Sequence, residues 1–217
     1  MKLIDRLLNL LFPPRCVFCR RLLDDLETDI CSGCRKQLPT AEKPIRRAGV
    51  PCCYSAYYYE GHVASSVRRF KFHDRSYYAG IYGSQIAMQL LRNEVSFDIL
   101  TWVPIGKKRR RERGYDQTLL LAEAVARELG TTAQPLLRKL RDNPPQTAQP
   151  DAAARRGNVL GIYAMAVPAA EVREKRILLI DDVITTGATL SECTRVLSTA
   201  GAAGVVCATL AATRKKD

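Results

Sequence analysis

The chain lacks any hydrophobic run long enough to cross a bilayer, because no stretch reaches the roughly 18 apolar residues that a spanning helix needs. The amino end also lacks a small-residue cleavage site after its apolar segment, which a secretory signal would have. We therefore expect a cytoplasmic protein without a transmembrane segment. Residues 1–12 form an amphipathic pattern, for which packing on protein is the main interpretation and peripheral membrane contact the lesser one.

Acidic residues are scarce relative to basic ones. The 217 residues include 34 Lys and Arg against 22 Asp and Glu, which gives a formal net charge of +12. This balance favours polyanionic or phosphorylated partners over basic ones, and both nucleic acid and a phosphate-rich small molecule qualify. The sequence has no internal repeat. Its length allows one full α/β domain and a small appendage.

Residues 177–190 say most about function, because four apolar residues run directly into two adjacent acids. The continuous run at residues 177–180 is typical of a strand buried on both faces. We therefore expect Asp181 and Asp182 to emerge at the carboxyl end of that strand, where open α/β sheets bind their ligands. Paired carboxylates there can accept hydrogen bonds from two hydroxyls of a sugar. An ordinary strand-to-helix turn with capping residues is the alternative, but it needs fewer of these residues.

The turn after the acids has the composition of a phosphate site. Gly187 permits backbone conformations closed to other residues, and the helix expected next would direct free amides at an anion. That helix should end at Gly201 and lead into a parallel strand over residues 205–210. The segment resembles the 5-phosphoribosyl-1-pyrophosphate (PRPP) motif of type I phosphoribosyltransferases. The resemblance implies that the acids bind ribose and that the 5′-phosphate is held by Thr185, Thr186, Gly187, Ala188 and Thr189.

Eight cysteines fall into two groups. The first group forms two CxxC pairs separated by eleven residues: Cys16, Cys19, Cys31 and Cys34. In a reducing compartment this spacing predicts two metal knuckles around one zinc ion, and four thiolates leave no open position for a reacting water. The zinc is therefore expected to be structural, with redox or disulfide chemistry as the lesser alternative. Of the second group, Cys193 and Cys207 are expected in the core, and Cys52 and Cys53 receive no role.

Proline and glycine between residues 39 and 51 mark a boundary near residue 50. We expect an amino-terminal unit at residues 1–50, with the amphipathic segment and the four-cysteine module, and a larger domain at residues 51–217. The larger domain should contain further strands and helices and one long loop. Strands are expected over residues 54–59 and 97–103, helices over 63–69, 77–91 and from near Asp116 to Gly130, and the loop over 143–154.

Six basic residues lie within residues 107–113, directly after the strand expected at 97–103. Taken alone they fit a solvated rim as well as a functional surface. A pyrophosphate group carries several negative charges, so cations and free amides are expected at the same sheet edge as the acids. We assign these contacts to Pro104, Ile105, Gly106 and Lys107. Single-stranded nucleic acid, bound through charge and base stacking, is the expected partner of Arg109, Arg110, Arg111, Arg113, Tyr115, Arg155 and Arg156.

Several short motifs together resemble the ComF family of competence-associated phosphoribosyltransferase-like proteins. They are the two CxxC pairs, Tyr59-Glu60-Gly61, Phe70-Lys71-Phe72, Val103-Pro104, Arg113-Gly114-Tyr115-Asp116-Gln117, residues 155–158 and the acid-pair motif. Members commonly have Asn where this chain has Asp116. The resemblance implies an α/β fold with a type I phosphoribosyltransferase-like parallel sheet flanked by helices, and a small N-terminal zinc module with four cysteine ligands. It also implies a part in handling single-stranded DNA during transformation.

Two functions follow, and the sequence leaves both open. As a phosphoribosyltransferase, the protein would bind PRPP with Mg²⁺, and a nucleophile would attack the anomeric carbon. Asp181, Asp182 and Lys107 are then the catalytic group, with Lys107 stabilising the departing pyrophosphate. As a binding module, the protein would use PRPP or a nucleotide as a ligand or signal, while it holds single-stranded DNA or a helicase-like partner. The sequence identifies neither the acceptor nor the oligomeric state.

Overall fold

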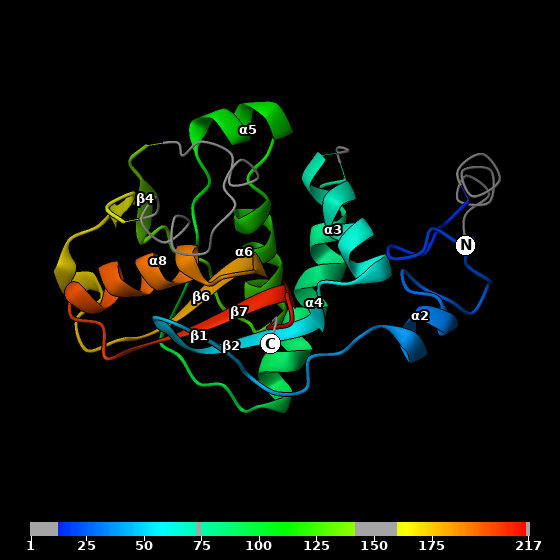
Figure 1. Ribbon diagram of the computed structural model, residues 1–217, viewed down its shortest axis with the longest axis horizontal. Coiled ribbons are helices and arrows are strands. Elements are labelled where there is room, and N and C mark those ends of the chain that lie inside the picture. The colour runs from blue at the N-terminus through cyan, green and yellow to red at the C-terminus, as the bar shows by residue number, and fades with distance from the viewer. Residues whose placement is uncertain (1–12, 73–74, 142–159, 216–217) are drawn as a thin grey trace.

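The computed structural model describes residues 13–72, 75–141 and 160–215 (Figure 1). Within this part of the chain, the main sheet has five strands in the order β1-β2-β7-β6-β3. Four strands run parallel to one another: β2 (Val50–Tyr58), β7 (Gly204–Ala212), β6 (Arg176–Ile184) and β3 (Ile99–Trp102). β1 (Ile45–Arg47) pairs antiparallel with β2 at the edge. The segment expected at residues 1–12 and the loop expected at 143–154 lie outside the described residues.

Helices cover both faces of the sheet, because the central strands are apolar on both sides. Along β6, Leu178 and Ile180 lie in one core cluster, which also holds side chains of α4 (Tyr78–Arg92) and α6 (Gln117–Glu128). Ile177 and Leu179 lie in a second cluster, with side chains of α8 (Ala188–Thr199). This alternation follows from the strand geometry, in which successive side chains point to opposite faces. Asp181 and Asp182 follow Ile180 in the same strand, so their side chains also point to opposite faces of the sheet.

The predicted strand, helix and parallel strand around the acid pair are confirmed. β6 leads through a turn into α8, and β7 returns parallel to β6 with Ile177 opposite Val205. The expected helix near Asp116 is also confirmed as α6, since the Asp116 carboxylate caps it by accepting from the Thr118 and Leu119 amides at 3.1 Å each. The expected helices at residues 63–69 and 77–91 correspond to α3 (Gly61–Phe72) and α4.

Two expectations about boundaries were wrong. β6 continues through both acids to Ile184, with Asp181 opposite Thr209, because β7 provides backbone partners along this whole length. The acids therefore lie inside the strand, not after its end. Lys107, which we expected in the loop after β3, instead begins the helix α5 (Lys107–Arg113), which ends at Gly114 with φ +76°. A helix of basic residues forms here because arginine and lysine have good helix propensity.

A small second sheet, not expected from the sequence, lies beside the main one. β4 (Leu137–Lys139) and β5 (Tyr163–Met165) pair antiparallel, and Leu137, Tyr163 and Met165 pack in the α8 cluster. The short 3₁₀ helix η2 (Ala169–Glu171) follows and leads into β6. The consequence for the site is that Lys139 and Tyr163 are brought to the same edge as the acid pair.

The cysteine-containing segment, which includes α2 (Ser32–Gln37), lies against α3 and α4 (Figure 1). Arg69 of α3 donates to the Val17 carbonyl at 2.9 Å and to the Phe18 carbonyl at 2.6 Å, so α3 holds the first CxxC turn directly. The Phe18 ring is fully buried and lies 5.3 Å from the Tyr57 ring of β2. The division at residue 50 stays a prediction. None of the described helices is long and apolar enough to span a membrane, and the cellular compartment stays a prediction too.

Candidate functional site

A pocket of about 220 Å³ opens at the carboxyl ends of β3 and β6. Its walls come from segments far apart in the sequence: the end of α3, the β3–α5 loop, α5, α6, the small second sheet and the β6–α8 turn. Of the residues that the sequence predicted for the site, the pocket brings together Asp181, Asp182, Thr185, Thr189, Pro104, Ile105, Arg109 and Arg113. Strand ends of a parallel sheet are the usual place for a ligand, and the position agrees with that rule.

The two acids reach this pocket from opposite faces of β6, as the alternation of a strand requires. Asp182 points to the α3 and α6 side, where its carboxylate is buried and both oxygens have partners. Lys71 Nζ lies 2.7 Å from Oδ1 in an ion pair, and Gln117 Nε2 donates to Oδ2 at 3.2 Å. The negative charge of Asp182 is thus balanced within the protein before any ligand arrives.

Asp181 has a different environment on the α8 side of the strand. One of its oxygens accepts the Asp182 amide at 2.8 Å. Burial, together with the neighbouring charge of Asp182, raises the pKa of the Asp181 carboxyl well above its ordinary value. The carboxylate form is costly in the unliganded pocket, and a cation or hydroxyl donors at this position would stabilise it. Of the two acids, Asp181 is therefore the one whose ionised form a bound ligand would stabilise more.

The turn between β6 and α8 has the conformation that a phosphate site requires. Gly187 has φ +83°, and a Cβ atom at this position would lie 2.7 Å from the Arg47 Cβ, so glycine is needed for two reasons. Arg47 of β1 braces the turn by donating to the Thr185 carbonyl at 3.0 Å and to the Thr213 carbonyl at 2.5 Å. The opposite side of the turn is left open.

That open side contains a hollow of about 20 Å³ lined by residues 183–190 and Asp181. The hollow adjoins the main pocket, because Asp181, Val183, Thr185 and Thr189 line both. α8 begins at Ala188, so the amides of its first turn lie at the hollow and lack helical partners. Amides and the helix dipole together favour an anionic group, and the volume suits one small group.

The basic segment divides into two faces because it is helical. Arg109 and Arg113, four residues apart on α5, share the face that lines the pocket. The guanidinium carbon of Arg113 lies 5.0 Å from the centroid of the Phe72 ring, which fixes its position. Lys107, Arg110 and Arg111 are exposed and do not line the pocket. Of the four arginines predicted for nucleic acid in this segment, two therefore face the pocket and two face solvent.

Other predicted site residues have different surroundings from those expected. Gly106 is the N-cap of α5 and is buried outside the pocket lining. The Tyr115 hydroxyl donates to the Phe70 carbonyl, and the two rings lie 5.9 Å apart, so Tyr115 joins α3 to the start of α6. Its ring therefore packs within the protein, where base stacking was expected. Arg155 and Arg156 lie outside the described residues.

Sequence reasoning missed several residues of the pocket. Lys71 and Gln117 contact Asp182, and Tyr59, Lys139 and Tyr163 complete the wall. Three of these residues were present in the motifs that carry the family resemblance, namely Tyr59, Lys71 and Gln117. Nothing in their local pattern indicates contact with residues of β6, because the contact arises only when the sheet forms.

The four predicted zinc ligands converge in the amino-terminal segment. The Sγ atoms of Cys16, Cys19, Cys31 and Cys34 all lie within 4.8 Å of one another, and Cys19 and Cys31 are separated by 3.6 Å. Sulfurs around a tetrahedral zinc ion are about 3.8 Å apart, given a zinc–sulfur distance of about 2.3 Å. The donor set and its spacing fit a closed zinc site with four thiolates. All four positions of the metal are then filled by protein, which indicates a structural ion.

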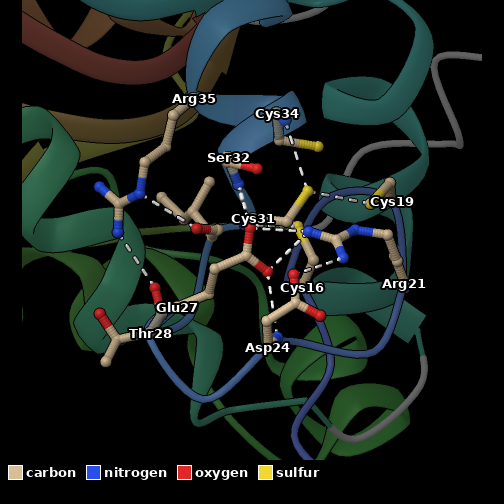
Figure 2. Close-up of polar contacts among 11 residues, drawn as sticks. Cys16, Cys19, Arg21, Asp24, Glu27, Thr28, Cys31, Ser32, Cys34 and Arg35 are labelled. Carbon is tan, nitrogen blue, oxygen red and sulfur yellow. Dashed lines mark hydrogen bonds and ion pairs between the residues drawn. The ribbon is translucent and has the colours of Figure 1, made fainter.

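Polar contacts hold the loop between the two cysteine pairs (Figure 2). The Glu27 carboxylate accepts from the Ser32 amide at 2.6 Å and from Arg21 at 2.6 and 2.7 Å. The Ser32 amide and the other partners lower the pKa of Glu27 to about 2. Arg35 donates to the Ile30 and Thr28 carbonyls at 3.0 and 3.1 Å. Arg21 also lies beside the Cys31 sulfur, where its positive charge offsets part of the negative charge of the thiolates.

Comparisons with known proteins find a match for the part of the chain that carries the acid pair and another for the cysteine-containing segment. Residues 116–217 match the phosphoribosyl transferase domain, and residues 7–62 match the double zinc ribbon domain. The zinc ribbon match, with the four converging cysteines, confirms the predicted structural zinc site.

Curated relatives match the chain over nearly its full length. It is 27% identical to Competence protein F of Haemophilus influenzae, over 86% of this chain and 92% of that protein. It is 24% identical to DNA utilization protein YhgH of Escherichia coli K12, over 89% of this chain and 94% of that protein. Among solved structures, glutamine PRPP amidotransferase from B. subtilis is similar with 22% identity and a TM-score of 0.44, over 64% of this chain and 29% of that longer chain.

Proposed function

Because this chain is a member of the ComF family, in which a zinc module accompanies a phosphoribosyltransferase-type domain, we propose that it binds PRPP in the pocket at the end of β6 and acts in single-stranded DNA uptake. The names of the relatives, a competence protein and DNA utilization proteins, support the second half of this proposal. The pocket supports the first half. The observation that carries it is that the pocket lined by both acids adjoins a small hollow at the start of α8, which Asp181 also lines.

The charges around the pocket suit a ligand with several phosphoryl groups. Four cationic side chains line it: Lys71, Arg109, Arg113 and Lys139. Two acids face them, and Asp182 is already paired with Lys71. Arg109 and Arg113 belong to α5, which follows β3, whereas the hollow lies at the turn that follows β6. A ligand with a phosphate in the hollow and a pyrophosphate near α5 would satisfy both ends.

Mg²⁺ fits the same site, because carboxylate oxygens are the ligands that this ion prefers. Asp181 would hold it, since the charge of Asp182 is balanced by Lys71 and that of Asp181 is not. The ion would supply partial neutralisation of the pyrophosphate charge. The protein contributes the positions of the sugar and phosphate and keeps the cations of α5 close to the diphosphate.

In the enzyme form of the proposal, an acceptor attacks the anomeric carbon, and the bond from that carbon to the pyrophosphate oxygen breaks with its electron pair leaving on the oxygen. Lys71, Arg109 and Arg113 are placed to stabilise the departing charge. We assigned this role to Lys107 from the sequence, but Lys107 is exposed and outside the pocket lining. Lys71 takes its place in the proposal.

A second candidate is a non-catalytic protein that uses PRPP or a nucleotide as a signal while it holds single-stranded DNA or a helicase-like partner. The exposed cations of α5 favour it, since they lie beside the pocket and not in it. Release of pyrophosphate separates the two candidates. Screening acceptors with PRPP and Mg²⁺ should give pyrophosphate for an enzyme and none for a binding protein.

Calorimetric titration with PRPP and Mg²⁺ tests the binding that both candidates share. The wild-type protein should bind. Asp181→Asn combined with Asp182→Asn should abolish binding, because it removes the charges at the ligand site. The fold should remain intact, because the substitutions remove no core volume. Zinc content and far-UV circular dichroism should stay unchanged, which excludes unfolding as the cause. Unchanged PRPP affinity in the double variant would reject the assignment of this pocket.

A further inference from the structure

Gln117 is a buried side chain with an unpaired oxygen. It is the first residue of α6, only 3% of its surface is exposed, and it lines the pocket. Its Nε2 donates to Asp182 Oδ2 at 3.2 Å. An ionised carboxylate only accepts hydrogen bonds, so the amide nitrogen must face Asp182 and the amide oxygen must face the other way. Among the described residues, this Oε1 atom has no hydrogen-bond partner.

Arg113 has an unpaired hydrogen-bond donor, where Gln117 has an unpaired acceptor. Its Nη1 atom is buried, and no described residue accepts from it. The guanidinium is held over the Phe72 ring at 5.0 Å, and Arg113 lines the same pocket as Gln117. Gln117 and Arg113 thus line the same pocket, and each keeps one buried side-chain atom without a partner, an acceptor in Gln117 and a donor in Arg113. Buried polar groups normally have partners, so two unpaired ones at a single cavity point to a ligand group.

A single ligand group that pairs with both atoms must donate one hydrogen bond and accept another. A phosphate oxygen accepts but does not donate, so it cannot satisfy Gln117 Oε1. An ammonium group donates but does not accept, so it cannot satisfy Arg113 Nη1. A hydroxyl group does both. Gln117 is also bonded to Asp182, and this carboxylate is one of the two acids assigned to the sugar.

We propose that Gln117 and Arg113 recognise a ring hydroxyl of the bound pentose phosphate, and that they make the site selective for ribose over deoxyribose. The inference rests on the proposed function, since it takes the pentose to lie between the acids and the phosphate hollow. It assigns specificity to two residues outside the acid-pair motif. The acids attract the sugar, and the Gln117–Arg113 pair selects which sugar is retained.

The expected selectivity follows from the cost of an unpaired buried group. A ligand without the hydroxyl leaves Gln117 Oε1 and Arg113 Nη1 desolvated and unpaired, which weakens binding by about tenfold to a hundredfold. Selectivity of this kind comes from rejection of the wrong ligand as much as from attraction of the right one.

Calorimetry with three probes tests the proposal: ribose 5-phosphate, 2-deoxyribose 5-phosphate and 3-deoxyribose 5-phosphate. The wild-type protein should bind at least one deoxy sugar about tenfold to a hundredfold more weakly than ribose 5-phosphate. In Gln117→Met the ribose compound should lose affinity while that deoxy compound does not, so the ratio should fall to about threefold or less. Arg113→Lys, which keeps the charge but loses Nη1, should lower the ratio in the same direction.

Gln85→Met is the matched control, because Gln85 Oε1 already accepts from the Tyr57 hydroxyl at 2.7 Å and lies outside this pocket. It should keep the wild-type ratio. Equal binding of all three sugars by the wild-type protein, or an unchanged ratio in Gln117→Met, would overturn the inference while leaving the proposed function intact. If neither ribose 5-phosphate nor PRPP binds, the proposed function itself fails. The wild-type comparison needs no variant and holds even where a variant misfolds.

Discussion

The zinc module and the pocket differ in how completely their polar groups are satisfied by the protein. Around the cysteines, Glu27 and Arg35 have several partners each, and no described residue between 13 and 40 has a buried side-chain nitrogen or oxygen without one. In the pocket, Gln117 and Arg113 each keep an unpaired buried atom, and Asp181 has a raised pKa. The first region is complete with its ion and holds the chain, whereas the second is incomplete without a ligand.

α3 connects these two regions. Arg69 and Ser66 bind backbone carbonyls of the first CxxC turn, and Lys71, two residues after Arg69, forms the ion pair with Asp182. The zinc module thus fixes the helix that delivers a cation to the pocket. This contrast predicts that loss of the zinc ion destabilises the protein, whereas removal of the uncompensated charge of Asp181 in the pocket stabilises it.

The largest effect should come from loss of the zinc ion. Cys19→Ser should lose the metal and unfold the segment around it, because zinc binding to small modules is worth about 10–16 kcal/mol. Metal analysis should give about one zinc per chain for the wild-type protein and much less for the variant. Cys52→Ser, which changes a cysteine outside the cluster, is the control. Full zinc content in Cys19→Ser would contradict the four-ligand site.

Lys71→Met should have the next largest effect, and Lys107→Met is its matched control. Removal of the Lys71 ammonium leaves the buried Asp182 carboxylate with Gln117 alone, so the free energy of unfolding should fall by about 1–3 kcal/mol. PRPP affinity should fall as well. Lys107 is exposed, and its change should alter stability by less than about 0.5 kcal/mol. Urea unfolding and calorimetry of both variants decide whether Lys71 or Lys107 serves the pocket.

Asp181→Asn should stabilise the protein while it weakens ligand binding. Because the pKa of Asp181 is raised in the folded state, the folded protein binds more protons than the unfolded chain above the ordinary aspartate pKa, and stability falls as pH rises through that range. Asparagine carries no charge to desolvate, so the free energy of unfolding at neutral pH should rise by about 1–3 kcal/mol.

Urea unfolding at about pH 5 and about pH 8 checks this prediction. Between the lower and the higher pH, the free energy of unfolding should fall further for the wild-type protein than for the Asp181→Asn variant. Parallel pH profiles for the two proteins would show that Asp181 ionises in the folded protein without a cost in stability, which would contradict its raised pKa.

The sequence revealed those parts of the site that are contiguous along the chain. The acids and the Thr185–Thr189 turn are neighbours in sequence, and the periodicity of residues 177–210 was enough to order strand, helix and strand. The four cysteines were recognisable for the same reason, since a knuckle is a local pattern. The alternation that separates Asp181 from Asp182 was also implicit in the strand, although the strand was expected to end before them.

Contacts between distant segments could not be predicted in this way. Lys71 and Gln117 lie 111 and 65 residues from Asp182 in sequence, and only the sheet order brings α3 and α6 to the same carboxylate. The basic segment shows a second limit. Its composition fitted a loop, a rim or a binding surface equally well, and only its helical conformation assigns Arg109 and Arg113 to one face and Arg110 and Arg111 to the other.

Substitutions on the two faces of α5 should have the smallest effects, and they test whether one face binds DNA and the other binds PRPP. If the solvent face binds single-stranded DNA, Arg110→Gln with Arg111→Gln should reduce the slope of log affinity against log salt by about 1.4, or about 0.7 for each lost phosphate contact. PRPP affinity should hardly change. Arg109→Gln with Arg113→Gln removes the same charge from the pocket face, so it should weaken PRPP binding and leave most of the salt slope. Equal loss of both activities in the two double variants would mean that α5 acts through net charge alone, and that the pocket and the DNA surface are not separate.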